Sequence, residues 1–523
     1  MIDLYRDFID WLVDQYRDNT ALICKKQPGI TFGELNAACN ALAAGLKRLG
    51  MSKGDTIAVC LGNSYHTRQM FWTAAKGGFV VALINTRLNP KEAAYIINNS
   101  EAACLIVSRE FQPKIEEIRD ELKTVRHFIG VDPGMPGFLD LEDIIASAPA
   151  DEVKCDLQED DLLWLQYTSG TTGFPKGAMY TQRSVAACAQ MGLEALKAYG
   201  KFHKEIRFLQ VAPSYALSGS GWDLMIQTSG ASVVIMDRFD AGEMMALIEK
   251  HRITDVHIVP AMLNMILSSP DFGRYDLASL ECITYGASPM PPELLRRGIR
   301  KLGPIFMQSY GGSEFGLGCL LGARDHVLEG EPEKVRRLES CGKPAKGVEV
   351  KIVDASGKEV AAGEVGEITI KSPMVMNGYW KMPQETAEVL KDGRYYTGDL
   401  GTRDLEGFIY IKDRSKDLII SGGFNVYPTE VENALTKHPA ISEVGVFGIP
   451  DDQWGETVCA HIVLNPGESE EAEEIIDFAG NHLARYKKPR RIEFVSALPR
   501  TPSGKVLRRQ LREPYWQGQD RKV

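Results

Sequence analysis

Residues 167–179, YTSGTTGFPKGAM, combine the residue types that bind phosphate oxygens. Gly170, Gly173 and Gly177 let the backbone approach a ligand closely, the hydroxyl side chains donate hydrogen bonds, and Lys176 adds a positive charge. The segment is not a P-loop of the GxxxxGK[ST] form, because Lys176 is followed by glycine and has no neighbouring hydroxyl to hold Mg²⁺. A Gly/Ser/Thr-rich segment is also typical of a flexible turn, so both interpretations stay open for this motif alone.

A second polar group, YGGSE, follows a predicted strand at residues 310–314. The ring of Tyr310 suits a purine, the hydroxyl of Ser313 suits a phosphate, and the carboxylate of Glu314 is the kind of hard oxygen ligand that Mg²⁺ prefers. The alternative is a turn that ends a strand with an N-capping serine. Residues 286–288, Gly-Ala-Ser, end an earlier predicted strand and are small enough to leave room for a flat ring.

Two further motifs place charged groups in turns. Asp399 in TGDLG has a carboxylate that can accept hydrogen bonds from both hydroxyls of a ribose, and Arg414 adds a planar set of donors; the alternative for Asp399 is an ordinary Asx-turn. Lys505 lies in TPSGK near the C-terminus, and a lone lysine is normally a solvated charge. Residues 485–512 contain ten basic residues and one acidic residue, which suits either nucleotide phosphates or a solvated face.

The elements that must position these groups follow from the apolar pattern. Between residues 162 and 310, short apolar runs alternate with helical patterns, which predicts parallel strands with crossover helices. From residue 348 the pattern alternates residue by residue around glycine-containing turns, which predicts an antiparallel meander or small barrel. We therefore expect an α/β fold with a large N-terminal domain at residues 1–413, barrel-like near 340–413, and a small mobile α+β domain at 418–523. The charged segment 414–417 is the expected hinge between them.

Composition limits the function classes. The chain has 523 residues and a net charge of −10, which argues against a nucleic-acid partner held by general positive charge. Its ten cysteines are scattered without a CxxC pair, which excludes a zinc ribbon and fits reduced thiols in a cytoplasmic protein. No apolar run approaches the roughly 20 residues that a transmembrane helix needs. We expect no transmembrane segment, and a homodimer is an open expectation.

Five segments, read in order, point to a family. They are YTSGTTGFPKGAM at 167–179, YGGSE at 310–314, YYTGDLG at 395–401, DRSKDLIISGGFNVYP at 413–428 and PRTPSGKVLR at 499–508. Together they closely resemble the adenylate-forming superfamily, which includes acyl-CoA synthetases, peptide-synthetase adenylation domains and firefly luciferase. The resemblance implies ATP, Mg²⁺ and coenzyme A as the small molecules that this chain uses.

The resemblance also implies roles for individual residues. Those expected to act in catalysis are Lys505, Lys176, Ser313 and Glu314, with Glu314 as the magnesium ligand. Those expected to bind the nucleotide are Thr168, Ser169, Gly170, Thr171, Thr172, Gly286, Ala287, Ser288, Tyr310, Gly311, Asp399 and Arg414. The remaining expected roles are Lys416 as the hinge, Ser421, Gly422 and Gly423 lining the coenzyme A tunnel, and Tyr215, Gly219, Gly221 and Trp222 lining the acyl pocket.

One departure from the family pattern concerns a histidine. Members commonly carry P-x-F-H, whereas this chain reads Pro213, Ser214, Tyr215, Ala216, so no role is assigned to a histidine there. The glycines at 219 and 221 suggest space for a medium or long fatty acid or an aromatic acid. The expected function is a carboxylate–CoA ligase that forms AMP. The alternatives are a ligase that loads a separate carrier protein and, from another class, a P-loop-type kinase or nucleotide-binding module, which the residues after Lys176 disfavour.

Overall fold

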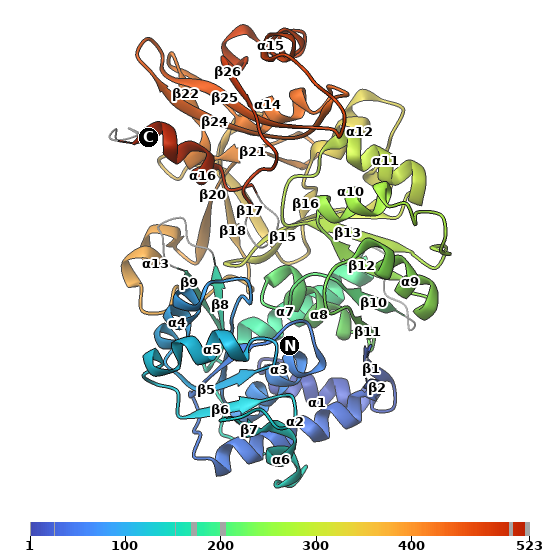
Figure 1. Ribbon diagram of the computed structural model, residues 1–523, viewed down its shortest axis with the longest axis vertical. Coiled ribbons are helices and arrows are strands. Elements are labelled where there is room, and N and C mark those ends of the chain that lie inside the picture. The colour runs from blue at the N-terminus through green and yellow to red at the C-terminus, as the bar shows by residue number, and fades with distance from the viewer. Residues whose placement is uncertain are drawn as a thin grey trace.

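The structure, a computed structural model, describes residues 2–25, 27–151, 153–168, 175–198, 206–500 and 506–517. Two large sheets, a smaller antiparallel sheet and the helices around them build the N-terminal domain. The small C-terminal domain, orange to red in Figure 1, lies at one end of the long axis. The predicted α/β class with parallel-rich sheets is confirmed.

The first large sheet has nine strands and carries most of the predicted βα units. In spatial order they are β16 (Lys343–Pro344), β15 (Gly316–Leu321), β14 (Phe306–Gly312), β13 (Cys282–Gly286), β12 (Asp255–Ile258), β10 (Arg207–Gln210), β11 (Ser232–Ile235), β1 (Thr20–Cys24) and β2 (Gln27–Thr31). The strands from β14 to β1 are parallel to one another, and β15, β16 and β2 add antiparallel edges.

The second large sheet has seven strands and contains the strand that precedes the Gly/Thr segment. In order they are β7 (Leu139–Asp140), β6 (His127–Gly130), β5 (Ala102–Val107), β3 (Thr56–Cys60), β4 (Val80–Leu83), β8 (Leu162–Thr168) and β9 (Lys176–Thr181). All neighbours are parallel except β8 and β9, which form an antiparallel pair. Residues 169–174 connect this pair and lie outside the described ranges.

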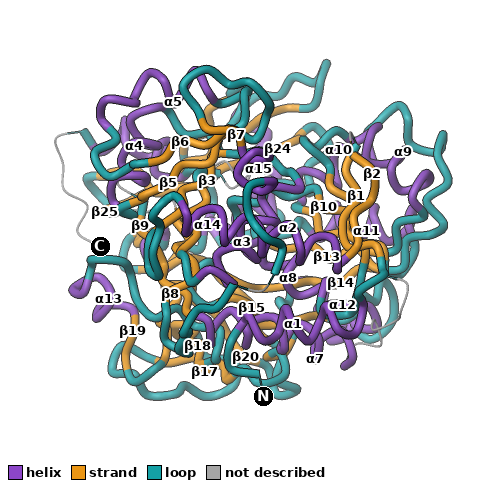
Figure 2. Tube along the Cα trace, turned by 90° about the horizontal axis from the view of Figure 1, so that it is seen from below, coloured by secondary structure: helices purple, strands orange, loops and turns teal. Residues whose placement is uncertain are grey.

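Helices form three layers around the two sheets, because each sheet buries apolar side chains on both faces. The layer between the sheets contains α1 (Tyr5–Tyr16), α2 (Phe32–Arg48), α3 (Tyr65–Gly77), α7 (Gln182–Ala198) and α8 (Leu217–Gln227). Figure 2 shows α2, α3 and α8 of this layer near its centre. The outer face of the nine-stranded sheet packs against α9 (Ala241–His251), α10 (Pro260–Ser268) and α11 (Pro292–Leu302). The outer face of the seven-stranded sheet packs against α4 (Pro90–Asn99) and α5 (Gln112–Ile118). Two shorter helices are α6 (Leu141–Ala146) and α12 (Pro332–Arg336).

A third sheet follows where residue-by-residue alternation was predicted, and all of its strand pairs are antiparallel. Its strands are β17 (Glu349–Val353), β18 (Gly366–Lys371), β20 (Arg394–Arg403), β19 (Leu390–Lys391) and β21 (Ile409–Arg414), with α13 (Pro383–Val389) before β19. A 3₁₀ turn, η4 (Ser415–Asp417), leads from β21 into the small domain.

The small domain has one sheet covered on both faces by short helices. Its elements are β22 (Ile419–Ser421), β23 (Phe424–Val426), α14 (Pro428–Leu435), β24 (Ile441–Asp451), β25 (Gly455–Leu464), α15 (Ala472–Gly480), β26 (Arg491–Phe494) and α16 (Arg508–Arg512). Apolar residues of α14 and α15 pack on one face of the sheet, and Leu511 of α16 packs on the other. Across the described ranges, none of the helices combines the length and the hydropathy needed to cross a bilayer.

Candidate active site

The three sheets of the large domain meet at the place where β14 and β9 come together. Tyr180 on β9 donates a hydrogen bond of 2.7 Å to the carbonyl oxygen of Ser313, in the turn after β14. The backbone amide of Met376, which follows β18, donates to the carbonyl oxygen of Glu314 at 2.9 Å. The amide of Trp380 donates to Gly177 of β9 at 2.8 Å. Residues far apart in the sequence therefore surround one region.

One end of this region contains three of the predicted nucleotide-binding side chains. The hydroxyl of Tyr310 donates to Oδ2 of Asp399 at 2.7 Å, and Nε of Arg414 lies 2.8 Å from Oδ1 of the same carboxylate. Asp399 and Arg414 face each other across the antiparallel β20–β21 pair, which explains their spacing in the sequence. The Asp399 carboxylate raises the pKa of Arg414, so the guanidinium stays charged. This end has hydrogen-bonding groups suited to a hydroxylated ligand such as a ribose.

The other end contains Lys176 and Glu314. The ammonium group of Lys176 lies 5.1 Å from the centre of the Tyr379 ring, and the hydroxyl of Tyr379 lies 3.3 Å from Oε1 of Glu314. Thr168 pairs with Lys176 across the β8–β9 hairpin. The predicted residues Ser169, Gly170, Thr171 and Thr172 lie outside the described ranges.

The chemistry of this end suits a phosphate chain with a divalent cation. Glu314 is half-buried and offers a carboxylate, and the described residues include no cluster of three or more His, Cys, Asp or Glu that could hold a metal ion alone. Mg²⁺ is often held by one or two carboxylates together with substrate phosphates, so a single glutamate next to a lysine fits that mode.

Sequence reasoning missed the tyrosines around Glu314. Tyr379 and Tyr395 are hydrogen-bonded to each other, and burial and the Glu314 charge raise the pKa of both, so both hydroxyls are neutral at physiological pH. Tyr395 lies on β20, in the YYTGDLG motif, whereas Tyr379 lies in an irregular segment that bridges to β9. Aromatic residues in the YYTGDLG motif were a usable signal for Tyr395, and local sequence offers none for Tyr379.

The glycines near the ends of β13 and β14 are required by packing between neighbouring backbones. A Cβ atom added to Gly286 would lie 2.5 Å from the carbonyl oxygen of Ser309, and one added to Gly311 would lie 2.5 Å from that of Gly316. Ala287 has a φ of +65°, in the left-handed region, and it is half-buried together with Ser288. The chain is therefore sharply bent directly after β13.

The predicted acyl pocket corresponds to the first turns of α8, and one expectation needs correction. An added Cβ at Gly219 would lie 2.2 Å from the carbonyl oxygen of Pro213, so this glycine permits a close backbone contact and opens no space for a ligand. Among the described residues, an added Cβ at Gly221 would meet only the side chain of Leu217, at 3.0 Å. Trp222 is buried and stacks on His257 of β12 with ring centres 5.2 Å apart.

Two side chains in this part of the molecule have buried polar atoms: His257 is buried, and Tyr215 is half-buried with its hydroxyl inside. Burial lowers the pKa of His257 to about 3, so its ring is neutral. Within the described part of the chain, neither ring nitrogen of His257 has a hydrogen-bond partner, and the hydroxyl of Tyr215 also has none. The backbone carbonyl of Tyr215 accepts a hydrogen bond of 2.9 Å from Gln166 of β8.

The remaining predicted residues lie in or beside the small domain. Lys416 is the middle residue of η4, and its carbonyl oxygen accepts from Arg512 at 3.4 Å. Ser421 ends β22, and Gly422 and Gly423 follow in a turn where the Gly422 amide donates to Trp454 of the same domain. Lys505 lies outside the described ranges.

Comparisons with known proteins agree along nearly the whole chain. A family model described as AMP-binding enzyme matches residues 9–380, and one described as AMP-binding enzyme C-terminal domain matches residues 430–505. The chain is 34% identical over 515 residues to the fatty acid–[acyl-carrier-protein] ligase ScoC of Streptomyces coeruleorubidus, covering 96% of this chain and 95% of that protein. It is 35% identical over 490 residues to the long-chain-fatty-acid–CoA ligase FadD13 of Mycobacterium tuberculosis, covering 93% of each. Among solved structures, the anthranilate CoA ligase AuaEII in complex with anthranoyl-AMP matches with a TM-score of 0.89 at 29% identity, covering 98% of this chain and 97% of that one.

Proposed function

Because the chain belongs to the AMP-binding enzyme family, we propose that it joins a carboxylic acid to AMP and then transfers the acyl group to coenzyme A. The observation that carries the proposal is the pairing of two chemically different ends in one site. Tyr310, Asp399 and Arg414 suit a nucleoside, and Lys176 and Glu314 suit the phosphates attached to it. Tyr310 lies on β14 and Glu314 lies two residues beyond the end of the same strand, so the two ends are close neighbours.

In the first step, a carboxylate oxygen of the acid attacks the α-phosphorus of ATP, the bond to the β-phosphate oxygen breaks, and pyrophosphate leaves. Lys176 and, by resemblance, Lys505 stabilise the charge on the phosphate oxygens. In the second step, the thiol sulfur attacks the acyl carbon, AMP leaves with its bonding electron pair, and the thiol proton passes to solvent. The mixed anhydride is needed because a free carboxylate is a poor acyl donor.

Glu314 is the residue that would hold Mg²⁺, whose chemistry is to neutralise phosphate charge. We expect Glu314→Gln to raise the Mg²⁺ concentration needed for half-maximal pyrophosphate release and to lower the maximal rate, because a neutral amide is a weaker ligand for a hard cation. The measurement is a magnesium titration of pyrophosphate release. Glu333→Gln, an exposed glutamate of α12, is the matched control. An unchanged magnesium dependence in Glu314→Gln would remove this residue from the metal site.

Coenzyme A is supported as the acceptor by an aromatic and basic surface on the small domain. The guanidinium of Arg490 lies 4.8 Å from the Trp454 ring centre, and Phe424 and Tyr486 pack with ring centres 4.9 Å apart. Flat rings next to cations suit the adenine and phosphates of coenzyme A. A carrier protein as acceptor is the second candidate, because one of the relatives is named as an acyl-carrier-protein ligase.

The deciding experiment measures pyrophosphate, AMP and thioester for a panel of acids, with no acceptor, with coenzyme A, or with a phosphopantetheinylated carrier protein. The panel spans short to long fatty acids and aromatic acids with and without a hydrogen-bonding substituent, because Tyr215 and His257 are polar groups near α8. We expect pyrophosphate with the preferred acid and thioester with coenzyme A. ADP in place of AMP would refute the proposal, and thioester on the carrier alone would replace coenzyme A.

Gly221 provides a test of the acyl pocket. We expect Gly221→Leu to lower kcat/KM for long or aryl acids about 10- to 200-fold while sparing short acids, because each methylene lost from a pocket is worth roughly 1–3 kcal/mol. The comparison is Gly219→Ala, whose added methyl would meet the Pro213 carbonyl and should lower activity equally for all acids. If Gly221→Leu also lowers activity equally for all acids, this part of α8 does not line the pocket.

A further inference from the structure

Asp413 lies at the end of the large domain and contacts two separate elements of the small domain. It is 4% exposed and belongs to β21, where it pairs with Leu400 of β20. Its Oδ2 accepts a hydrogen bond of 2.8 Å from the amide of Thr429 in α14, and its Oδ1 lies 3.7 Å from Nη1 of Arg508 in α16. Both contacts connect residues on opposite sides of η4, the turn that joins the two domains.

The contact with Thr429 supplies a missing helix cap. The amides in the first turn of a helix have no partner within the helix and are normally satisfied by a side chain at the N-cap position. Tyr427, the N-cap residue of α14, makes no side-chain capping bond. The Asp413 carboxylate therefore caps α14 from the other domain, and its negative charge is favourable at a helix N-terminus.

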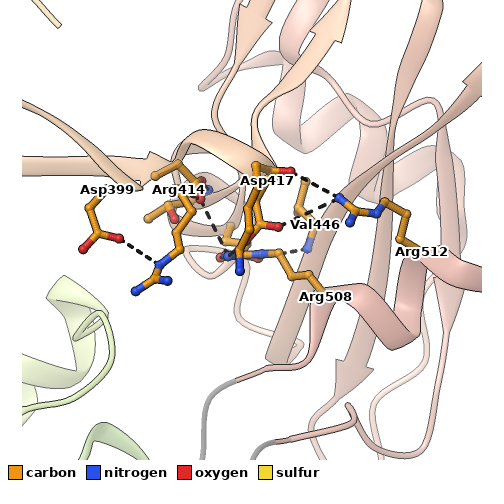
Figure 3. A network of polar contacts seen from close by, with 10 residues as sticks. Asp399, Arg414, Asp417, Val446, Arg508 and Arg512 are labelled. Atoms are coloured by element: carbon orange, nitrogen blue, oxygen red, sulfur yellow. Dashed lines mark hydrogen bonds and ion pairs between the residues drawn. The ribbon is translucent and has the colours of Figure 1, made fainter. Parts of the chain in front are cut away.

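Arg508 has a second set of partners that stays within the small domain. Its Nη2 lies 2.6 Å from Oε2 of Glu432, and Oε1 of Glu432 accepts from the amide of Val446 at 2.9 Å. Nη1 of Arg508 also lies 3.7 Å from Oδ2 of Asp417 in η4, and Figure 3 shows these two side chains next to each other. A rotation of the small domain about η4 would break the contacts of Asp413 but would carry Arg508, Glu432 and Val446 along together.

In the orientation that Asp413 stabilises, the Ser421–Gly423 turn contacts residues of its own domain, and Ser421 pairs with Gly455 of β25. The amide of Gly422 donates to the carbonyl oxygen of Trp454 at 2.8 Å, and Phe424, the residue after the turn, is 58% exposed. We propose that Asp413 is a positioning residue that holds the small domain in this orientation and thereby favours acyl-adenylate formation over thioester formation. The proposal rests on the two-step reaction proposed above and on the expectation, implied by the family resemblance, that the small domain rotates between the two steps.

The test compares the two steps in single-turnover assays. We expect Asp413→Ala to lower pyrophosphate release about tenfold, the scale of losing a helix cap together with an ion pair. Conversion of purified acyl-adenylate to thioester should stay within about twofold of wild type or rise, because release from this orientation favours the second step. Asp413→Asn keeps an acceptor for the Thr429 amide and should give a smaller change in the same direction.

Glu432→Gln is the matched control, because it weakens the same arginine without removing a contact between the domains. It should leave the ratio of the two rates unchanged. Equal losses in both steps for Asp413→Ala, or an equal change of the ratio in Glu432→Gln, would overturn the proposal.

A direct measurement separates this proposal from the proposed function. Glu333 in α12 and Glu473 in α15 are each replaced by a genetically encoded noncanonical amino acid that carries a spin label. The distance between the two labels reports the distance between the domains without substrate. We expect a broader or shifted distance distribution in Asp413→Ala and Asp413→Asn, and a wild-type distribution in Glu432→Gln. An unchanged distribution in both Asp413 variants would overturn the positioning role, whereas a wild-type protein that releases no pyrophosphate with any acid would refute the proposed function instead.

Discussion

Replacing Lys505 with alanine should suppress pyrophosphate release by about 10²-fold or more, the scale of losing one preorganised group that stabilises charge in a transition state. The same variant should still convert purified acyl-adenylate to thioester, because the resemblance places Lys505 at the phosphate only during the first step. The two steps are measured separately, with pyrophosphate release for one and thioester formation from added acyl-adenylate for the other.

Two control variants make this result interpretable. Lys505→Arg keeps the positive charge and should retain more of the first step than Lys505→Ala does. Lys437→Ala removes an exposed lysine elsewhere in the small domain and should change neither step. Equal loss of both steps in Lys505→Ala would show that this lysine does not serve the first step alone.

Replacing Lys416 with proline should have the opposite pattern. Lys416 lies in a 3₁₀ turn, whose φ range includes the value that proline imposes, so the substitution is compatible with the observed orientation. Fixing φ of residue 416 restricts rotation of the small domain about η4. We therefore expect acyl-adenylate to form and persist, while thioester formation falls on the order of tenfold or more.

The control at the same position is Lys416→Ala, which removes the side chain and leaves the backbone free to rotate. It should keep thioester formation well above the level of Lys416→Pro. The measurement follows acyl-adenylate and thioester over time in one reaction. If Lys416→Pro makes thioester at the wild-type rate, residue 416 is not the hinge of the small domain.

Much of the fold could be predicted because its signals are local. The strands from β10 to β14 and the helices between them follow the apolar periodicity closely, and so do the antiparallel strands after residue 348. The membership of strands in sheets was not predictable in the same way. β1 and β2, near the N-terminus, join β11 more than 200 residues later, and β8 lies in a different sheet from β10. Pairing of this kind depends on contacts between distant segments, which no local pattern encodes.

The same distinction between local signals and contacts of distant segments applies to the candidate site. Asp399 and Arg414 were predicted to act together from their motifs, and the β20–β21 register places them opposite each other. Tyr379 was missed because it reaches Glu314 only when an irregular segment packs against β9. The space expected at Gly219 is filled by the backbone of Pro213, a contact that depends on how the chain turns before α8.

The sequence by itself determined the family, because the five motifs are contiguous segments, and the matches at residues 9–380 and 430–505 confirm it. The reacting groups stay predictions that rest on residue types within these motifs. Only the tertiary structure decided how the two domains are held together. In the sequence, Asp413 stands next to a charged segment and has no visible partner. Its contacts with Thr429 and Arg508 exist because β21, α14 and α16 come together in the folded chain. A buried carboxylate finds its partners through packing, and packing is a property of the folded chain.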